Sequence, residues 1–389
     1  MKLFQRLLVA PAALSLLAPI SANANEVNLN DISNYSDIED IELADSFNTL
    51  PESTLLAGGE GLGGGMEGFD DSSYDGGFSS TTSASFSVDM AIGAVESNVN
   101  SEALSTAYGY QMDLSTSFTG EDTLAVAIDA GAGAAALGEL DLNATTGDEL
   151  IVDGITYSFP VGDKITVLVG DSTSGSALYS TACVYGGFTN TLDDCGNFSS
   201  AFVATGHDDS VGFSASYDIG NGFTGAIGYQ GQGTADAGLA TEDGLDFYGG
   251  QLTYTGDSYG ASVTYANLDV ATAWGLNGYY SFASDLPSVS VGYEFTEADA
   301  GVVAVGEAEA TQWFVGLQWD ELGNGTLGVA LGSRGPQLED AEEDMAYELF
   351  YTYNVNDSMS ITPAIFILED NDPGADDETG VVVKTSFSF

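Results

Sequence analysis

The sequence predicts an all-β fold, a sixteen-stranded antiparallel transmembrane β-barrel that follows an N-terminal signal peptide. Three observations support this fold class. From residue 82 onward, stretches of about ten residues alternate between apolar and polar side chains. Short and long connections between these stretches alternate along the chain. Charged residues make up only 16% of the sequence, below the roughly 25% of ordinary soluble domains, while Tyr, Phe, Gly, Ser and Thr are abundant.

The first element is a secretory signal peptide at residues 1–24. Lys2 and Arg6 form its basic start, an apolar stretch follows, and the small-residue motif Ala22-Asn23-Ala24 predicts cleavage after Ala24. An uncleaved membrane anchor is the alternative. Beyond this segment, the sequence has no run of 18 or more apolar residues, so a transmembrane helix is not expected.

The chain that remains after cleavage is strongly acidic. Only Lys164, Arg334 and Lys384 are basic among its residues, and three bases against 59 acids give a formal net charge of −56. Such a surface repels the phosphates of nucleic acids and attracts cations, so no nucleic-acid partner is expected.

The second element is a flexible N-terminal segment at residues 25–81. It is acidic and glycine-rich, and it ends in AGGEGLGGGMEGFDDSSYDGG. The segment lacks the apolar pattern that a folded domain needs.

The third element is the barrel itself, at residues 82–389. In SVGFSASYDIG, Val211, Phe213 and Tyr217 share one face, whereas Ser214 and Asp218 share the other. The polar faces contain mainly Ser, Thr, Gly, Gln and Asn, as expected for a water-filled lumen, although a soluble sandwich would also alternate. The sixteen predicted strands span about 82–95, 104–118, 121–131, 150–161, 163–172, 210–219, 222–231, 245–256, 258–267, 272–283, 287–297, 310–320, 325–335, 344–355, 358–369 and 379–389.

The connections favour a membrane barrel over a sandwich. Seven are tight turns: TGED, VGDK, IGNG, TGDS, SDLP, ELGNG and NVNDS. The links between them are mostly longer, although the link near Asp269 is short. Transmembrane barrels show this alternation because their periplasmic turns are short and their outer loops long.

Cys183 and Cys195 are the two cysteines, and they lie twelve residues apart in one connection. In an exported chain this spacing predicts a disulfide. A zinc site is the alternative, but His207 is the single histidine and further soft ligands are missing. Neither a metal nor another cofactor is therefore expected.

The chain ends on a strand, VVVKTSFSF, whose apolar face includes Phe387 and Phe389. We expect this strand to pair with the first one and close the barrel. The terminal aromatic strand resembles the assembly signal of outer-membrane barrel proteins, which implies the barrel-assembly machinery as a partner. Lys384 departs from that signal, because a small residue usually stands there.

Four stretches resemble the cyanobacterial outer-membrane porins, which are related to the carbohydrate-selective porin family. They are TTGDELIVDGITYSFPVGDKITVLVGD at 145–171, DLSTSFTGEDTL at 113–124, TQWFVGLQWDE at 311–321 and MSITPAIFILED at 359–370. The resemblance implies a homotrimer in the outer membrane of a Gram-negative-type, cyanobacterial cell, with passage of carbohydrates, inorganic ions or iron. Such porins commonly carry an S-layer-homology module, which residues 25–81 cannot supply, so peptidoglycan anchoring is not expected.

The resemblance also implies a constriction of the pore. In sixteen-stranded porins the third outer loop folds inward, and it corresponds here to residues 173–209; an ordinary outer loop is the alternative. The candidate constriction residues are Cys183, Asp193, Asp194, Cys195, His207, Asp208 and Asp209.

Alternation of the strands predicts which charged side chains line the lumen. The acids are Asp89, Asp113, Asp129, Asp218, Glu294, Asp320 and Glu348, and the bases are Lys164, Arg334 and Lys384. Seven acids against three bases predict passage of cations. Alternatively, Lys164 and Arg334 are structural and neutralise neighbouring acids.

The outer loops are acidic as well, as in LEDAEED at 338–344 and EDNDPGADDE at 369–378. Divalent cations could bridge them to lipopolysaccharide in the outer-membrane lipid, or they could form a solvated acidic surface. An enzyme is not expected, because a Ser–His pair requires a histidine beside the serine and His207 has no paired motif nearby. A structural or adhesive barrel without an open pore is the other alternative.

Overall fold

The structure is a computed structural model that describes residues 81–97, 103–140, 142, 146–180, 182–193, 195, 210–231, 239–241, 246–267, 271–283, 286–298, 308–338, 342–371 and 375–389. The predicted signal peptide and residues 25–80 lie outside the described residues. Among the described residues, no helix is long and apolar enough to cross a membrane.

Strands account for nearly all the regular structure of the described part. They are β1 (Thr82–Glu96), β2 (Leu104–Thr116), β3 (Thr123–Gly133), β4 (Ile151–Val161), β5 (Ile165–Asp171), β6 (Val211–Gly220), β7 (Phe223–Gly231), β8 (Asp246–Thr255), β9 (Tyr259–Asn267), β10 (Ala271–Tyr280), β11 (Ser288–Ala298), β12 (Ala308–Trp319), β13 (Gly325–Ser333), β14 (Gln337–Leu338), β15 (Met345–Asn356), β16 (Met359–Leu368) and β17 (Glu378–Ser388). A short 3-10 helix, η2 (Ala135–Leu140), lies between β3 and β4.

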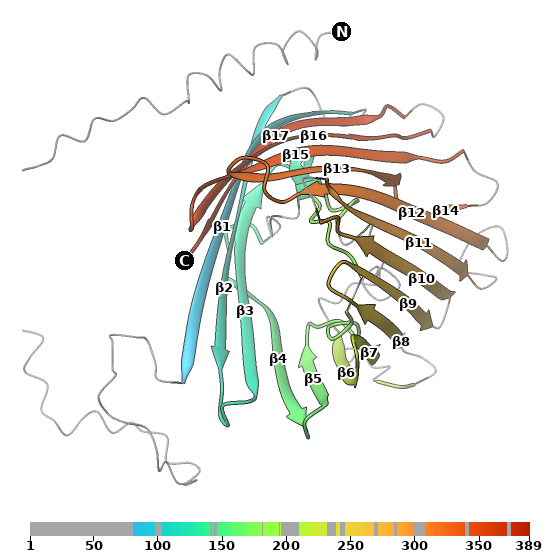
Figure 1. Ribbon diagram of the computed structural model, residues 1–389. Helices are drawn as coiled ribbons and strands as arrows, with labels where there is room; N and C mark the ends of the chain where they lie inside the picture. The colour runs from blue at the N-terminus through green and yellow to red at the C-terminus, as the bar shows by residue number, and fades with distance from the viewer. Residues whose placement is uncertain are drawn as a thin grey trace, which may run out of the picture. The chain divides into compact units, whose positions relative to one another are not determined.

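The strands form one closed antiparallel barrel (Figure 1). Each long strand pairs with the next long strand along the chain, and β17 pairs with β1 through a register that runs from Ser87 opposite Ser388 to Glu96 opposite Thr379. The backbones of Phe86 and Phe389 exchange two further hydrogen bonds, of 2.8 and 3.0 Å. The prediction of a sixteen-stranded antiparallel barrel is therefore confirmed for the described residues, with the two-residue β14 as an addition beside β12.

The observed strand limits differ from the predicted ones by no more than three residues. Local sequence explains this agreement, because glycine and asparagine with positive φ end several strands, including Gly162, Gly220 and Asn221. The seven short turns lie at one end of the barrel, here called the turn end, and the longer connections lie at the other, here called the loop end.

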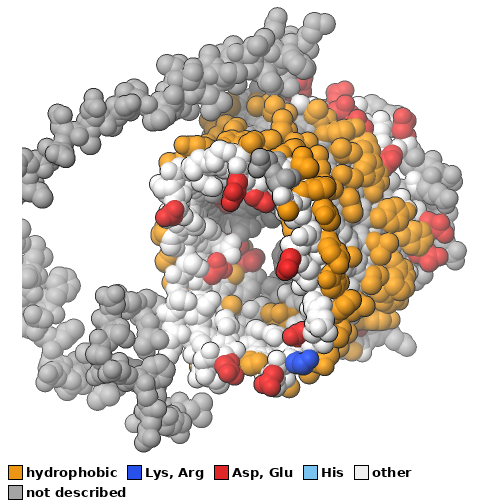
Figure 2. Space-filling view, in the orientation of Figure 1, with side chains coloured by type: hydrophobic (Ala, Val, Ile, Leu, Met, Phe, Trp, Pro, Cys, Tyr) orange, Lys and Arg blue, Asp and Glu red, His pale blue; other side chains and the backbone are white. Residues whose placement is uncertain are grey.

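The outer surface of the barrel is apolar. On β1, Met90 and Ile92 are 54% and 45% exposed, whereas Ala91 between them is buried on the inner side. Figure 2 shows hydrophobic side chains over the outside, and mainly polar atoms with several Asp and Glu side chains around the central hollow. Aromatic rings gather near the ends of strands: Phe223 and Tyr254 at the turn end have centroids 4.9 Å apart, and those of Tyr265 and Trp274 at the loop end are 4.8 Å apart. These two bands match the interfacial girdles of membrane barrels.

One turn is held by an aspartate. The Asp122 carboxylate, between β2 and β3, accepts hydrogen bonds from the backbone of Phe118 and Thr119 and from the hydroxyls of Ser117, Thr119 and Tyr157, at 2.7 to 3.0 Å. The hydrogen bond from the Thr119 hydroxyl is the main cause that lowers the Asp122 pKa far below its usual value, and desolvation opposes it. Five donors thus fix this turn around one charge.

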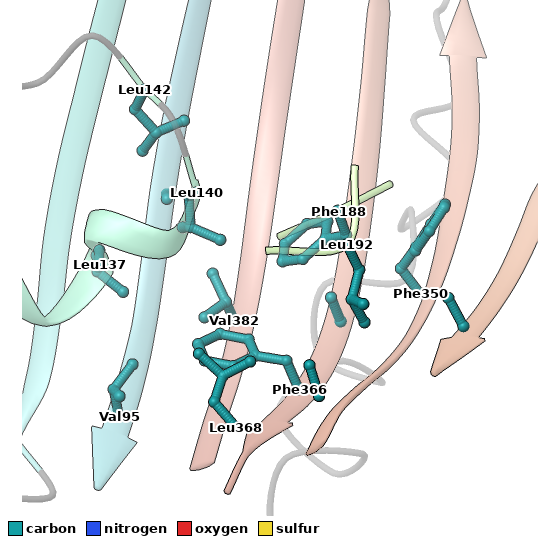
Figure 3. Packing of buried hydrophobic residues seen from close by; sticks show 14 of the residues in the cluster. Val95, Leu137, Leu140, Leu142, Phe188, Leu192, Phe350, Phe366, Leu368 and Val382 are labelled. Carbon is teal, nitrogen blue, oxygen red and sulfur yellow. The ribbon is translucent and has the colours of Figure 1, made fainter. Parts of the chain in front are cut away.

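The barrel also contains a hydrophobic core in its interior. Inward side chains of β1, β12, β15, β16 and β17 contact residues from the β3–β4 and β5–β6 connections (Figure 3). The larger buried members are Val95, Leu137, Leu140, Leu142, Tyr185, Phe188, Leu192, Phe314, Phe350, Phe366, Leu368 and Val382. The prediction that the inner faces are polar is therefore wrong for this side of the barrel, because two connections fold inward and cover it.

Candidate functional site

The candidate site is the space inside the barrel where the described residues of the β5–β6 loop, 172–180, 182–193 and 195, lie along the wall. The described part of this loop contacts the inner faces of strands from β6 to β15; it turns at residues 175–178 and is extended from 182 to 186. Its backbone N–H groups donate to inward side chains of β7, β6, β8, β9, β11 and β12, respectively: Gly175 to Gln230 (3.1 Å), Leu178 to Ser214 (3.2 Å), Ser180 to Gln251 (2.7 Å), Ala182 to Ser262 (3.4 Å), Val184 to Ser290 (3.1 Å) and Gly186 to Gln318 (2.8 Å).

From Ser180 to Gly186, the donors are every second residue. This is the period of an extended chain, in which alternate N–H groups point to the same side. The acceptors come in order from β8, β9, β11 and β12, and β10 joins through Asn277, whose amide oxygen accepts from the Ser262 hydroxyl at 3.1 Å. Each such bond contributes about 1 kcal/mol net, so the row fixes the loop through many modest contributions.

Glu348 of β15 binds the loop most strongly. This side chain is 3% exposed. Its Oε1 accepts from the Tyr185 hydroxyl at 2.6 Å and the Phe188 N–H at 3.0 Å, and its Oε2 accepts from the Thr189 N–H at 2.9 Å and the Thr189 hydroxyl at 2.6 Å. Burial, followed by the charge of Glu348, raises the pKa of Tyr185, so its hydroxyl stays protonated and donates. All four bonds to the carboxylate are charge-assisted, the stronger class of hydrogen bond.

Glycines on the wall allow the two inward connections to approach the strands. A methyl group at Gly228 would collide with the carbonyl oxygen of Gly175, and one at Gly109 would collide with that of Leu142. These two wall positions therefore require glycine, which has no side chain, so that the backbone of each connection can lie against the strand.

The two connections are joined to each other. The backbone N–H of Asn190 donates to the Glu139 carbonyl at 2.8 Å, and the Thr191 hydroxyl donates to Glu139 Oε2 at 2.9 Å. Leu137 and Leu140 of η2 share the internal core with Leu192 of the loop. Together, η2 and the described residues of the β5–β6 loop form what we call the inner belt.

The predicted disulfide between Cys183 and Cys195 is confirmed. It closes the part of the loop that contacts Ser290, Gln318 and Glu348. In the chain-entropy account, a ring of about twelve residues stabilises a folded segment by about 3 kcal/mol. The bridge therefore stiffens the segment that the wall holds.

The predicted acidic residues lie on several levels of the wall. Asp89, Asp113, Asp129 and Glu294 occupy inward register positions on β1, β2, β3 and β11. Asp129 and Glu294 are each 3% exposed, whereas Asp113 accepts from Gln111 at 2.9 Å. At the turn end, Asp218 accepts from the Gly220 N–H at 2.8 Å, and Asp320 follows β12 and accepts from Gln318 at 2.6 Å.

The three basic residues lie in different places. Lys164 stands in the β4–β5 turn, outside the strands, and its ammonium is 5.7 Å from the centroid of the outward Tyr217 ring. Arg334, just after β13, donates to the Glu369 carbonyl and lies 3.7 Å from Asp370 and 3.9 Å from Glu378. Lys384 is inward, and its ammonium is 5.4 Å from the Phe188 ring centroid.

The remaining predicted residues are the other candidate constriction residues and the two C-terminal phenylalanines. Asp194, His207, Asp208 and Asp209 lie outside the described residues. Asp193 is described and partly buried in the loop. Phe387 lies on the outward face, opposite Val88, and the exposed Phe389 ring stacks on Phe86 with centroids 5.6 Å apart.

Sequence reasoning missed the residues that hold the loop. Glu139, Tyr185, Phe188 and the inward Gln and Ser side chains carry no recognisable motif. One signal was present: Phe314 and Phe350 fall on the polar face of their own strands, which indicates an apolar contact inside the barrel. No group of three or more His, Cys, Asp or Glu within the described ranges could hold a metal ion.

The barrel is similar in fold to solved structures of bacterial porins. OprB of Pseudomonas putida gives a TM-score of 0.59 at 12% identity, over 79% of this chain and 94% of that chain. A triple mutant of the Rhodopseudomonas blastica porin gives a TM-score of 0.50 at 17% identity, over 79% of this chain and 100% of that chain. No protein family model and no curated protein matches the sequence. At these identities the similarity shows the fold.

Proposed function

We propose that this protein is an outer-membrane porin, a channel for passive diffusion of small hydrophilic solutes and ions that prefers cations. The observation that carries the proposal is the closed barrel with the β5–β6 loop bound along its inner wall by Glu348 and six neighbouring side chains. A loop held inside a barrel narrows the lumen and sets which solutes pass. The fold shared with porins supports this reading, and it supports a channel without enzymatic activity.

The cation preference rests on the charges of the wall. Asp89, Asp113, Asp218, Asp320 and the other predicted acids lie inward or at the turn end, whereas Arg334 is close to two acids. A wall dominated by one sign of charge concentrates the opposite ions in the lumen. Carbohydrates, inorganic ions and iron are the solutes that the sequence resemblance proposes.

The membrane location and the assembly of the protein follow from the same proposal. An apolar outer face with two aromatic bands suits a bilayer with lipopolysaccharide in its outer leaflet, and a homotrimer is the expected assembly. We further propose that residues 1–24 direct export, that residues 25–81 form a linker, and that the outward Phe387 and Phe389 contact the barrel-assembly machinery.

A structural or adhesive barrel without an open pore remains the second candidate. The internal core favours it, because Phe314, Phe350 and Phe366 fill one side of the lumen with apolar side chains. The two candidates differ in whether water crosses the barrel between the inner belt and the opposite wall.

The test is single-channel conductance of the purified protein in a planar bilayer under a KCl gradient. The proposal expects steady conductance with a reversal potential that favours K⁺. Conductance that favours Cl⁻ would refute the cation preference, and no conductance by the folded barrel would favour the structural candidate. Swelling of liposomes in a pentose, a hexose and a trisaccharide would then rank neutral solutes by size.

A further inference from the structure

We infer that Lys384 is the residue that limits the cation preference of the channel, because it places one positive charge where the inner belt meets the wall. The inference rests on the proposed function, since it names the charge that tunes the selectivity of the same lumen. It concerns small inorganic ions and leaves neutral solutes unaffected.

The position of Lys384 is fixed by the strand register. It lies opposite Ala91 of β1 and Thr362 of β16, and Val382, two residues earlier on the same face, is 1% exposed in the internal core. The Lys384 side chain therefore points into the barrel.

The inner belt meets this side chain through Phe188. The Lys384 ammonium lies 5.4 Å from the centroid of the Phe188 ring, a distance at which the ring face attracts a cation. Phe188 is itself held, because its N–H donates to Glu348 at 3.0 Å. The positive charge of Lys384 therefore lies against the inner belt, where it acts on the ions that pass through the lumen.

The other two bases of the described barrel lie elsewhere. Arg334 is at the loop end, near Asp370 and Glu378, and Lys164 is in a turn against an outward ring. Among the described strand residues, Lys384 is accordingly the base that faces the lumen.

A carboxylate lies on the neighbouring level of the wall. Asp89 pairs with Ser386, so it lies one inward position from Lys384 toward the turn end. A cavity of about 290 Å³ begins there and is lined by Ser87, Asp89, Asn354, Ser360 and Ser386, among others. Asp89 attracts cations, and the Lys384 ammonium at the next level repels them. The same ammonium attracts anions, which the acidic residues of the wall repel.

The size of the effect follows from Coulomb's law. For an ion about 7 Å away in water with a Debye length of about 10 Å, one unit charge changes the local concentration by a factor of about 1.6. Cation and anion change in opposite directions. Removal of the charge therefore raises the ratio of K⁺ to Cl⁻ permeability by about threefold.

The experiment measures reversal potentials in a KCl gradient for the full-length protein and four variants. Lys384→Gln should raise the K⁺ to Cl⁻ ratio about threefold, Lys384→Glu should raise it further, and Lys384→Arg should keep the wild-type ratio. Arg334→Gln is the matched control, because it removes the same charge at the loop end, and it should leave the ratio within the error of the wild type.

Each outcome is decisive. An unchanged ratio in Lys384→Gln, or an equal rise in Arg334→Gln, overturns the role of Lys384 while the wild type still conducts. If the wild-type barrel does not conduct at all, the proposed function fails first, and this inference falls with it. Heat-modifiable migration on gels shows that each variant has folded, and Lys384→Arg separates loss of charge from loss of packing.

Discussion

Replacement of Glu348 by glutamine should release the inner belt from the wall. The substitution keeps the size of the side chain and removes its charge. One of the two carboxylate oxygens becomes an amide nitrogen, which donates hydrogen bonds. In the structure both oxygens accept from donors, including the backbone N–H groups of Phe188 and Thr189.

The cost can be worked from these contacts. Whichever way the amide is oriented, one backbone N–H loses its acceptor inside the internal core, where an unmade hydrogen bond costs about 1–3 kcal/mol. The remaining bonds lose their charge assistance as well. A total of about 3 kcal/mol corresponds to an increase of about a hundredfold in the population of belts detached at this point.

The assay is the noise of the open channel. A belt that detaches and rebinds changes the cross-section of the lumen, so Glu348→Gln should show frequent conductance steps that the wild type lacks. Glu321→Gln is the matched control, because it removes the same charge from an exposed position in the turn after β12. If Glu348→Gln is as quiet as the wild type and the control, Glu348 does not hold the belt.

Three further predictions concern other contacts of the fold. Cys183→Ser should lower the stability of the loop by about 3 kcal/mol, measured as faster protease cleavage within the loop, and reduced wild type should behave the same way if the disulfide is the cause. Gly228→Ala should push Gly175 from the wall and lower the melting temperature of the barrel, whereas Gly138→Ala, with open space around it, should not. Because hydrogen bonds lower the Asp122 pKa, its charge stabilises the fold above the unfolded pKa of about 3.9 and less as the pH falls below it. The melting temperature of Asp122→Asn should thus be lower than wild type at pH 7, and this difference should shrink below about pH 4; a difference that is constant from pH 7 to 2 contradicts the assignment.

The strands could be predicted because their signals are local. Alternation over ten residues and a Gly, Asn, Asp or Pro residue at each turn are visible within a short window, and alternation also assigned Asp89, Asp113 and Glu348 to the inner face. The same rule misplaced Lys164. The predicted strand 163–172 begins in the structure at Ile165, after the turn with Gly162 at φ of 66°, so the alternation of β5 does not extend to Lys164.

The contacts of the inner belt could not be predicted in the same way. Leu178 and Ser214 are 36 residues apart, and Tyr185 and Glu348 are 163 apart. A serine or glutamine that accepts from a distant backbone N–H is indistinguishable in sequence from one that faces water. The internal core was missed for a related reason: Phe314 and Phe350 are apolar residues on otherwise polar strand faces, and their shared partner Tyr185 lies in a connection that lacks alternation.

From Gly175 to Gly186 the wall binds the loop mainly through backbone N–H groups, with the Tyr185 hydroxyl as the side-chain exception, and this has a consequence for how the channel can be altered. A main chain offers the same N–H whatever residue carries it, proline excepted. Substitutions at the exposed loop positions Ala177, Ser180 and Gly186 can therefore install new chemistry in the lumen while the anchoring bonds persist. The serine and glutamine acceptors on the strands have no such freedom. Engineering of the channel's permeability should therefore vary the exposed side chains of the loop and conserve the acceptor side chains of the strands.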